Sequence, residues 1–553
     1  MISRTQSPSS GIDSLPFLYY SNPMNIPMYR CVILLPLMLL AVLPVTGLNN
    51  LDMITKDSSE FVLLQDLALQ AGAAPISGSG PYCREEVLDF LDNIPAEALD
   101  SRGRILRARL RDQLAPDPFF SFPGGLNIDI APSLTLEANL RTGSTFGGWV
   151  VSPGERTPAA ELPLSLWLGP WFYAEMEASL REDPFAGARE SWGALNIPTN
   201  FSAVDNHYPY RAFLNAGGSH WLFRFGRDQL SWGNGRTGNM ILSDTAPYHD
   251  FAELTFFWDV FQFTTAALSL ESWNDDGTAA DEYRMFLSHR FEVRLWDRLN
   301  LAVTEGISIR GEYFEFRYLN PLMVYHNWFL NDRDGNIIFS LEAEYTPWKY
   351  FSVYGQLCAD TITSRYEKER YGAGAVPDAF GYIAGIRSSV PLGKGSLRSG
   401  FEWAYTDPWM YIAEGQPDFT LTRRFISNYL GRKMLIHLPL GYSLGPDGAV
   451  YDLFIQYASG FTWQITAALR IQRKGEIDLY TPLETGEEAV AMTSPTGIPE
   501  TETVVSLSGE YRFPLGITAG GGIFLQGIKN PGHEAGAYLL DLQFLLRIKY
   551  SLK

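Results

Sequence analysis

The sequence predicts an all-β transmembrane protein: a large antiparallel outer-membrane β-barrel with a small N-terminal helical unit on the periplasmic side. From residue 119 onward, apolar and polar side chains alternate in runs longer than most strands of soluble sheets. Aromatic residues make up 14% of the chain, yet its mean hydropathy is only -0.08. Strands with one apolar and one polar face explain both observations. We expect three parts: an extension with a signal peptide (1–47), a helical unit (48–118) and the barrel (119–553).

The first part contains the one long apolar run of the chain, residues 31–45. Arg30 precedes this run, Pro36 and Pro44 interrupt it, and Gly47 follows shortly after it. The run is short for a bilayer-spanning helix, whereas a basic flank before an apolar centre is typical of a secretory signal. We therefore expect a cleaved leader and an exported mature protein, with an uncleaved anchor as the alternative.

Residues 48–118 have apolar side chains at helical spacing, which predicts three short amphipathic helices. Asp57 and Glu60 resemble a capping box before the first helix, and Asp100 or Ser101 is the expected cap of the third. A helical unit that leaves the export channel before the barrel should stay in the periplasm. The expected core positions are Phe61, Leu64, Ala68, Ala71, Val87, Leu88, Leu91, Ile94, Leu106, Leu110 and Leu114.

The third part alternates with a period of two, most clearly between residues 538 and 550, where every second residue is apolar or aromatic. Runs of roughly 9–11 residues have the length of strands tilted across a bilayer. Every backbone donor and acceptor must be paired in hydrocarbon, so such strands must close into a barrel. Roughly 24 residues per strand and connection, over about 430 residues, give about 16 to 18 strands.

The polar face of these strands must point into the lumen, and it is unusually charged. Opposite charges on neighbouring strands can form a salt-bridge network that holds the wall together, and any ligand site would be a subset of these positions. The charged positions are Glu137, Arg141, Glu175, Glu177, Arg224, Arg227, Arg284, Arg290, Glu292, Arg294, Glu305, Arg310, Glu342, Glu344 and Arg398.

Residues 221–247 change character halfway along. Their first part alternates as a strand with Arg224 directed inward, and their second part is punctuated by Gly233, Gly235 and Gly238. Irregular backbone cannot face hydrocarbon, so the glycine-rich part must lie at a rim or fold into the lumen, where a close backbone approach needs glycine. We expect a constriction there.

Several classes of function are disfavoured. A net charge of -19 argues against nucleic acid as a partner. Outside the leader only Cys83 and Cys358 remain, and the seven histidines are scattered, so we expect neither a disulfide framework nor a metal site. The G-x-S-x-G of residues 441–445 precedes a turn and a strand, whereas a hydrolase elbow precedes a helix. We predict no catalytic residues and no cofactor, and rank an outer-membrane enzyme acting on lipid or glycan last.

Several segments carry the pattern of a known family: residues 64–72, 81–86 and 91, then 226–247, 288–290, 301–305, 318–321 with His326, and 354–356 with Asp360. Taken together, these matching segments resemble the Wzi-like family of outer-membrane capsule-assembly proteins. Two features depart from the family pattern: Cys83 stands at a helix cap where serine is expected, and residues 550–553 do not end on an aromatic residue. The resemblance implies a monomeric barrel of about 18 strands, a periplasmic helical bundle, and a surface lectin that holds capsular or related exopolysaccharide.

We therefore predict a barrel in the outer membrane, in contact with its lipid, that retains surface polysaccharide. The alternative is a porin or uptake channel for small solutes such as sugars. The candidate polysaccharide-binding or lumen-constriction residues are the polar positions of the matching segments, together with Trp232. They are Arg227, Trp232, Asn234, Arg236, His289, Arg290, Glu305, Asn320, His326, Gln356 and Asp360.

Overall fold

A computed structural model describes residues 48–552 with internal gaps. The predicted signal peptide lies outside the described residues, as does His326. The gaps are residues 116, 144–147, 184–193, 199–203, 206, 208, 272, 275–277, 279, 281, 312–315, 326–334, 364, 373–375, 413–419, 430 and 431.

Three helices form where the helical periodicity predicts them: α2 (Ser59–Ala71), α3 (Arg84–Asn93) and α4 (Ser101–Gln113). The Ser58 hydroxyl caps α2 by accepting a hydrogen bond from the Phe61 amide at 3.1 Å, so the cap lies one residue after the expected Asp57. The Asp100 carboxylate caps α4 in the same way. Cys83 precedes α3 without a side-chain cap, because a thiol is a poor hydrogen-bond acceptor.

Among the described residues, twelve short strands and helices lie outside the three helices and the barrel wall. They are β1 (Met53–Ile54), β2 (Ser79–Gly80), β3 (Tyr82–Cys83), η1 (Ala96–Ala98), η2 (Pro153–Glu155), β11 (Ser231–Trp232), η4 (Phe316–Leu319), α5 (Arg365–Tyr371), β20 (Thr422–Tyr429), β21 (Arg432–Pro439), α6 (Glu487–Val490) and η7 (Pro531–His533).

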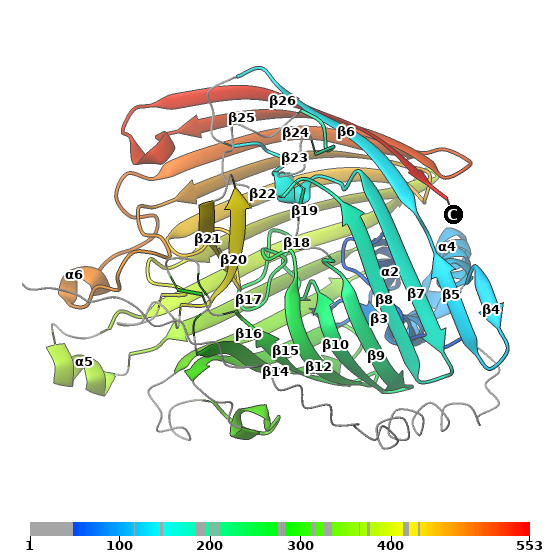
Figure 1. Ribbon diagram of the computed structural model, residues 1–553, viewed down its shortest axis with the longest axis horizontal. Coiled ribbons are helices and arrows are strands. Elements are labelled where there is room, and N and C mark those ends of the chain that lie inside the picture. The colour runs from blue at the N-terminus through cyan, green and yellow to red at the C-terminus, as the bar shows by residue number, and fades with distance from the viewer. Residues whose placement is uncertain are drawn as a thin grey trace, which may run out of the picture. The chain divides into compact units, whose positions relative to one another are not determined.

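The remaining strands form one closed antiparallel barrel (Figure 1). Its strands are β4 (Phe120–Phe122), β5 (Leu126–Ile130), β6 (Ser133–Arg141), β7 (Ala160–Leu168), β8 (Phe172–Leu180), β9 (Ala212–Gly218), β10 (Trp221–Asp228), β12 (His249–Phe257), β13 (Phe261–Ser269), β14 (Tyr283–Leu295), β15 (Leu299–Gly311), β16 (Gly335–Trp348), β17 (Phe351–Thr361), β18 (Ala379–Leu392), β19 (Gly395–Thr406), β22 (Gly448–Ser459), β23 (Trp463–Lys474), β24 (Glu500–Arg512), β25 (Ile517–Lys529) and β26 (Tyr538–Ser551).

The first wall strand is interrupted, because Pro132 separates β5 from β6. β5 pairs with β7, and β6 pairs with β26, which closes the barrel. Counting β5 and β6 once and leaving out the short β4, the described residues form 18 wall strands. The predicted fold class is confirmed, with the strand number at the upper end of the expected range.

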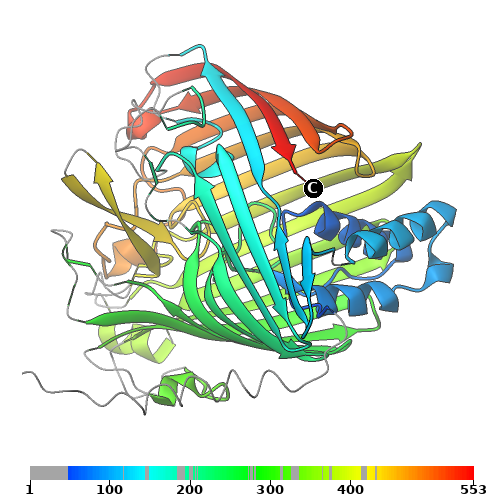
Figure 2. The same ribbon diagram turned by 45° about the vertical axis from the view of Figure 1, so that its right-hand side comes forward.

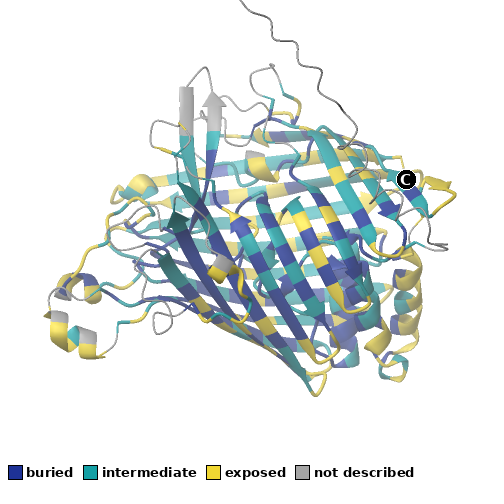
Figure 3. Cartoon of the chain, turned by 60° about the horizontal axis from the view of Figure 1, so that its bottom comes forward, coloured by how far each residue is buried: buried dark blue, intermediate teal, exposed yellow. Residues whose placement is uncertain are grey.

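The two faces of the wall differ as the alternation predicts. In β6, Leu134 and Leu136 are exposed on the outer side, whereas Thr135 and Glu137 are buried on the inner side. Figure 3 shows the same banding on neighbouring strands. No helix in the described part of the chain has the length and apolar character that crossing a membrane requires.

The helices gather at one end of the barrel, and β20, β21, α5 and α6 lie at the other (Figures 1 and 2). Polar contacts attach the helical unit to the inner wall. Arg398 of β19 binds both carboxylate oxygens of Asp66 in α2. Asn300 of β15 donates to the Pro75 carbonyl at 2.7 Å. Lumen-facing side chains of the wall thus hold the helical unit in place. The periplasmic position of this end of the barrel stays a prediction.

Candidate binding site in the barrel lumen

Residues 229–247, here called the inward loop, leave the wall after β10 and enter the lumen. Trp232 is 1% exposed, and its strand β11 pairs with β2 of the helical unit. Met240 and Leu242 are fully buried in one apolar cluster with wall residues such as Phe286 and Ile383. That cluster takes side chains from strands between β12 and β22, so an apolar core occupies this part of the lumen.

Two glycines of the inward loop are required by close approach. A Cβ on Gly233 would lie 2.2 Å from the Asn239 side-chain oxygen, and one on Gly235 would lie 1.9 Å from the Gly238 carbonyl. Gly233 also has a φ of +128°, which larger residues rarely adopt. The glycine pattern predicted a compact, irregular segment, and the structure shows that the loop folds back on itself.

A buried polar cluster, here called the Arg290 network, underlies this core. The Arg290 guanidinium, 1% exposed, binds Glu292 at 2.6 Å and Glu342 through two nitrogen atoms at 2.5 and 2.9 Å. Gln356 donates to Glu342 at 2.9 Å and accepts the Met240 amide at 2.9 Å. Three predicted site residues, Trp232, Arg290 and Gln356, therefore belong to the support of the inward loop.

Lys56 ties the helical unit to the same loop. Its ammonium group donates to the carbonyl oxygens of Gly78, Ser231 and Gly233 at 2.6, 2.7 and 2.7 Å. Glu292 of the Arg290 network accepts from the Gly78 amide and from two serine hydroxyls in the same segment. No sequence pattern marks Lys56 as a functional residue, because a single lysine in a connection belongs to no periodic pattern.

Arg236 and Arg470, here called the lumen arginine pair, meet on one buried carboxylate. Their Nε atoms donate to the two oxygens of Asp452 at 2.8 and 3.1 Å, and Arg236 lies 3.8 Å over the Phe454 ring. Their side chains are 38% and 48% exposed. Among the described residues nothing accepts from the remaining nitrogen atoms of either guanidinium. The pair therefore offers free donors to the lumen.

The backbone around Arg236 is fixed by a second buried carboxylate. Glu402 accepts the amides of Arg236 and Thr237 at 2.6 and 2.8 Å and the Tyr354 hydroxyl at 2.7 Å. The Asn234 carbonyl oxygen accepts a hydrogen bond from Arg387 at 2.6 Å. Sequence analysis did not single out Asp452 or Arg470, although they face each other across β22 and β23 and alternation places both inward.

Arg227 lies apart from these groups, at the end of β10. It binds both oxygens of Asp250 at 2.7 and 3.1 Å and stands 4.0 Å over the Tyr248 ring. Asp250 also accepts from Arg423 of β20, at 2.7 Å. Arg227 thus connects the wall with the β20–β21 hairpin.

The other predicted site residues mostly hold connections in place. His289 faces Glu305 at 3.2 Å, and Glu305 accepts the Tyr325 amide at 3.0 Å. Asp360 accepts the Tyr411 amide at 2.6 Å. Asn320 is exposed, and its side-chain oxygen accepts the nearby Leu322 amide at 3.1 Å. The predicted binding residues therefore lie in several separate places, and the described ones do not form a single site.

Sequence analysis did not recognise one polar cluster at the barrel end opposite the helices. Oxygen and nitrogen atoms of Asp183, Asp205 and His207 lie within 4.8 Å of one another, an arrangement that could hold a metal ion. His207 Nδ1 is 3.1 Å from Asp205, and its Nε2 donates to the Ile426 carbonyl at 2.9 Å. These residues lie in one long connection without helical spacing, so they left no pattern to recognise.

This cluster predicts a pH dependence. Burial lowers the pKa of His207, but its hydrogen bond and ion pair with Asp205 outweigh burial and raise the imidazole pKa above its ordinary value. A raised folded-state pKa contributes stability that is complete below the ordinary value of 6.5 and is lost as pH rises through the raised value.

We expect hydrogen-exchange protection factors at the Asp205 and His207 amides to fall over that pH range. In His207→Gln the decline should disappear, because glutamine does not titrate there. A decline of equal size in the variant would show that His207 is not its source.

The closed wall with an apolar exterior, together with the loop and charge network inside it, defines the class: an outer-membrane-type β-barrel whose lumen is partly occupied by its own chain. No protein-family model matches the sequence, and no curated protein matches it.

The fold is similar to that of Wzi from Escherichia coli, an outer-membrane protein involved in group 1 capsule assembly and a carbohydrate-binding β-barrel. The two are 13% identical, with a TM-score of 0.57 and coverage of 91% of this chain and 99% of that chain. The outer-membrane channel DcaP of Acinetobacter baumannii is 11% identical, with a TM-score of 0.36 and coverage of 79% and 100%. OprD of Pseudomonas aeruginosa is 9% identical, with a TM-score of 0.38 and coverage of 77% and 95%. The predicted resemblance is thus supported for the fold.

Proposed function

We propose that this protein is a non-enzymatic outer-membrane barrel that binds and retains capsular or other surface polysaccharide. The observation that carries the proposal is the apolar core of the inward loop, in which Trp232, Met240 and Leu242 are buried inside the lumen. A diffusion channel needs a wide water-filled path, and such a core opposes it. The fold shared with Wzi supports the same function.

The lumen arginine pair is the proposed contact with the glycan. A guanidinium offers several donors in a fixed plane, which suits carboxylates and vicinal hydroxyl groups. Asp452 fixes one nitrogen of each guanidinium and leaves the others free. The more deeply buried candidates, Trp232, Arg290 and Gln356, act in this proposal by holding the inward loop that presents Arg236.

Deleting the gene tests the function directly. We expect the amount of cell-associated polysaccharide to fall and polysaccharide in the medium to rise, with total synthesis unchanged. Unchanged retention in the deletion strain would refute the proposal.

A solute channel is the second candidate, and the opposite side of the lumen favours it. The inward side chains of Arg547 and Lys549 on β26 are 32% and 34% exposed, whereas wall residues of the apolar core such as Phe286 are fully buried. Planar-bilayer recording separates the two functions. Polysaccharide binding predicts little steady current, whereas a large, steady single-channel current would favour the channel.

Arg470→Gln should weaken binding of the purified barrel to the strain's own polysaccharide about tenfold or more, since a hydrogen bond from a charged group is worth about 1.5–3 kcal/mol. Arg236 remains to pair with Asp452, so folding should be retained. Biosensor titration measures the affinity, and Arg102→Gln on the exposed side of α4 is the control. Wild-type affinity in folded Arg470→Gln would remove the arginine pair from the site.

A further inference from the structure

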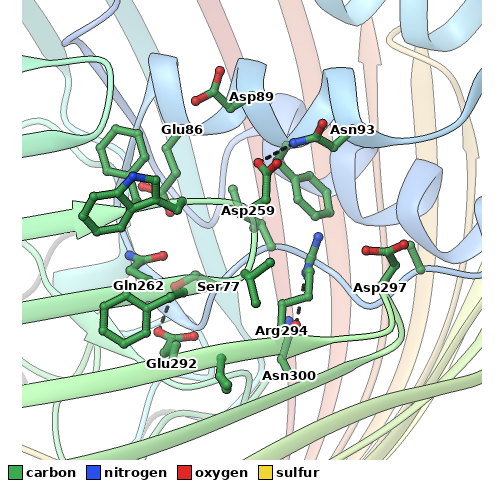
Figure 4. A pocket seen from close by; sticks show the side chains of 18 of the residues that line it. Ser77, Glu86, Asp89, Asn93, Asp259, Gln262, Glu292, Arg294, Asp297 and Asn300 are labelled. Carbon is green, nitrogen blue, oxygen red and sulfur yellow. Dashed lines mark hydrogen bonds between the residues drawn. The ribbon is translucent and has the colours of Figure 1, made fainter.

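A pocket of about 290 Å³ lies at the helical end (Figure 4), and neither member of the lumen arginine pair lines it. Helix α3 forms one side, and the turns joining β12 to β13 and β14 to β15 form the other. Asn93 of α3 donates to Asp259 across the pocket at 2.6 Å. This helical-end pocket plays no part in the function proposed above.

Negative charge dominates the lining. Glu86, Asp89, Asp259 and Asp297 all line the pocket. Arg294 is the one cationic side chain among the described lining residues, and it is already engaged. It donates to the Ala74 and Pro75 carbonyls and lies 4.4 Å over the Phe90 ring. Its positive charge acts on Asp259 and Asp297, but no described lysine or arginine forms an ion pair with Glu86 or Asp89.

The buried Glu86 side chain shows that the excess negative charge destabilises the folded protein. It is 8% exposed, and its Oε1 atom has no hydrogen-bond partner among the described residues. Burial, followed by the carboxylates of Glu292 and Glu253, raises the pKa of Glu86 well above its ordinary value. A hydrogen bond from Gln262 lowers this pKa in part, but a buried carboxyl oxygen without a donor is still destabilising. A ligand that brings hydrogen-bond donors and positive charge would remove this cost.

Apolar side chains form another part of the lining, beside polar ones such as Gln262 and Asn300, and the pocket limits the size of the ligand. Phe90, Trp258, Val260 and Phe261 border the acidic groups. The volume lies at the lower limit of small-molecule pockets, which suits one side chain better than an oligosaccharide unit. Aromatic faces also attract cations. An alkyl stem would cover the apolar wall, while its cationic end reached Glu86 and Asp89.

We infer that the helical-end pocket binds a lysine or arginine side chain of a protein partner. The ammonium or guanidinium group would pair with Glu86 and Asp89, and its stem would lie against Phe90 and Trp258. An amino sugar carries the same cationic group, but it would set several hydroxyl groups against the apolar wall. This inference stands whether or not the barrel binds polysaccharide.

The test uses the full chain in detergent with three probes: N-acetyl-lysine amide, N-acetyl-norleucine amide, which lacks the ammonium group, and glucosamine. Saturation-transfer NMR and calorimetry should show a lysine-probe Kd on the order of millimolar. The norleucine probe should bind at least tenfold more weakly. Equal binding of the lysine and norleucine probes, or tighter binding of glucosamine, would overturn the inference.

Glu86→Gln keeps the size of the side chain and should weaken binding of the lysine probe at least tenfold. Asp112→Asn, on the exposed side of α4, is the matched control and should bind as the wild type does. If Glu86→Gln fails to fold, the less buried Asp89→Asn provides the same test. Wild-type affinity in the folded variants would show that these carboxylates do not recognise the probe.

Discussion

Replacing Arg290 with methionine is expected to destabilise the folded barrel by about 3–5 kcal/mol, the usual effect of removing one partner from a buried ion pair. Glu292 and Glu342 would keep their negative charges in a buried position without the guanidinium that binds both. Glu292 also orders the Gly78 segment, so the loss should extend to the contact between the helical unit and the inward loop.

Urea unfolding of the barrel in lipid vesicles, followed by tryptophan fluorescence, measures this change. Arg102→Met, which removes an exposed arginine from α4, is the control and should change the unfolding free energy by less than about 0.5 kcal/mol. If the two variants are equally stable, the Arg290 network does not support the fold. Loss of glycan retention in a stable, folded Arg290→Met barrel would instead make Arg290 a contact residue.

Trp232→Ala should release the inward loop and open the lumen. Truncating a buried tryptophan costs about 3–5 kcal/mol, because the protein loses apolar contacts and gains a cavity. The loop is held by this core, by Lys56 and by the Gln356 contact, so we expect partial detachment with the wall intact. Single-channel current in planar bilayers should rise from near silence to a measurable level.

Trp296→Ala is the matched control, since Trp296 is 80% exposed in the turn between β14 and β15. It should leave both stability and current unchanged. A Trp232→Ala barrel that stays silent and loses no stability would show that this residue does not hold the loop. A wild-type barrel that already conducts strongly would favour the channel function.

Local pattern was enough to predict the wall and the helices. Alternation in β6 and β26 separates the lipid side from the lumen side, because a strand directs successive side chains to opposite faces. The cap at Asp100 was predicted from the preference of helix starts for short polar side chains. Both properties depend on residues that are neighbours in sequence.

The site residues were predicted less well for a physical reason. Arg236, Asp452 and Arg470 meet although more than two hundred positions separate the first from the last, and only closure of the barrel brings them together. The carboxyl cluster of Asp183, Asp205 and His207 also depends on how one long connection folds. Charge alone could not show which lumen residues are fully paired and which keep free donors.

The sequence by itself determined a closed barrel with a helical unit, since bilayer thickness and backbone hydrogen bonding leave few other solutions for long alternating strands. It also indicated that the glycine-rich part of residues 221–247 could not lie in the wall. Only the tertiary structure decided that this segment builds an apolar core inside the lumen, with Trp232 of β11 buried beside β2 and Arg236 held over Phe454. Those contacts join strands that are distant in sequence, and their free energy exists only once the wall has closed.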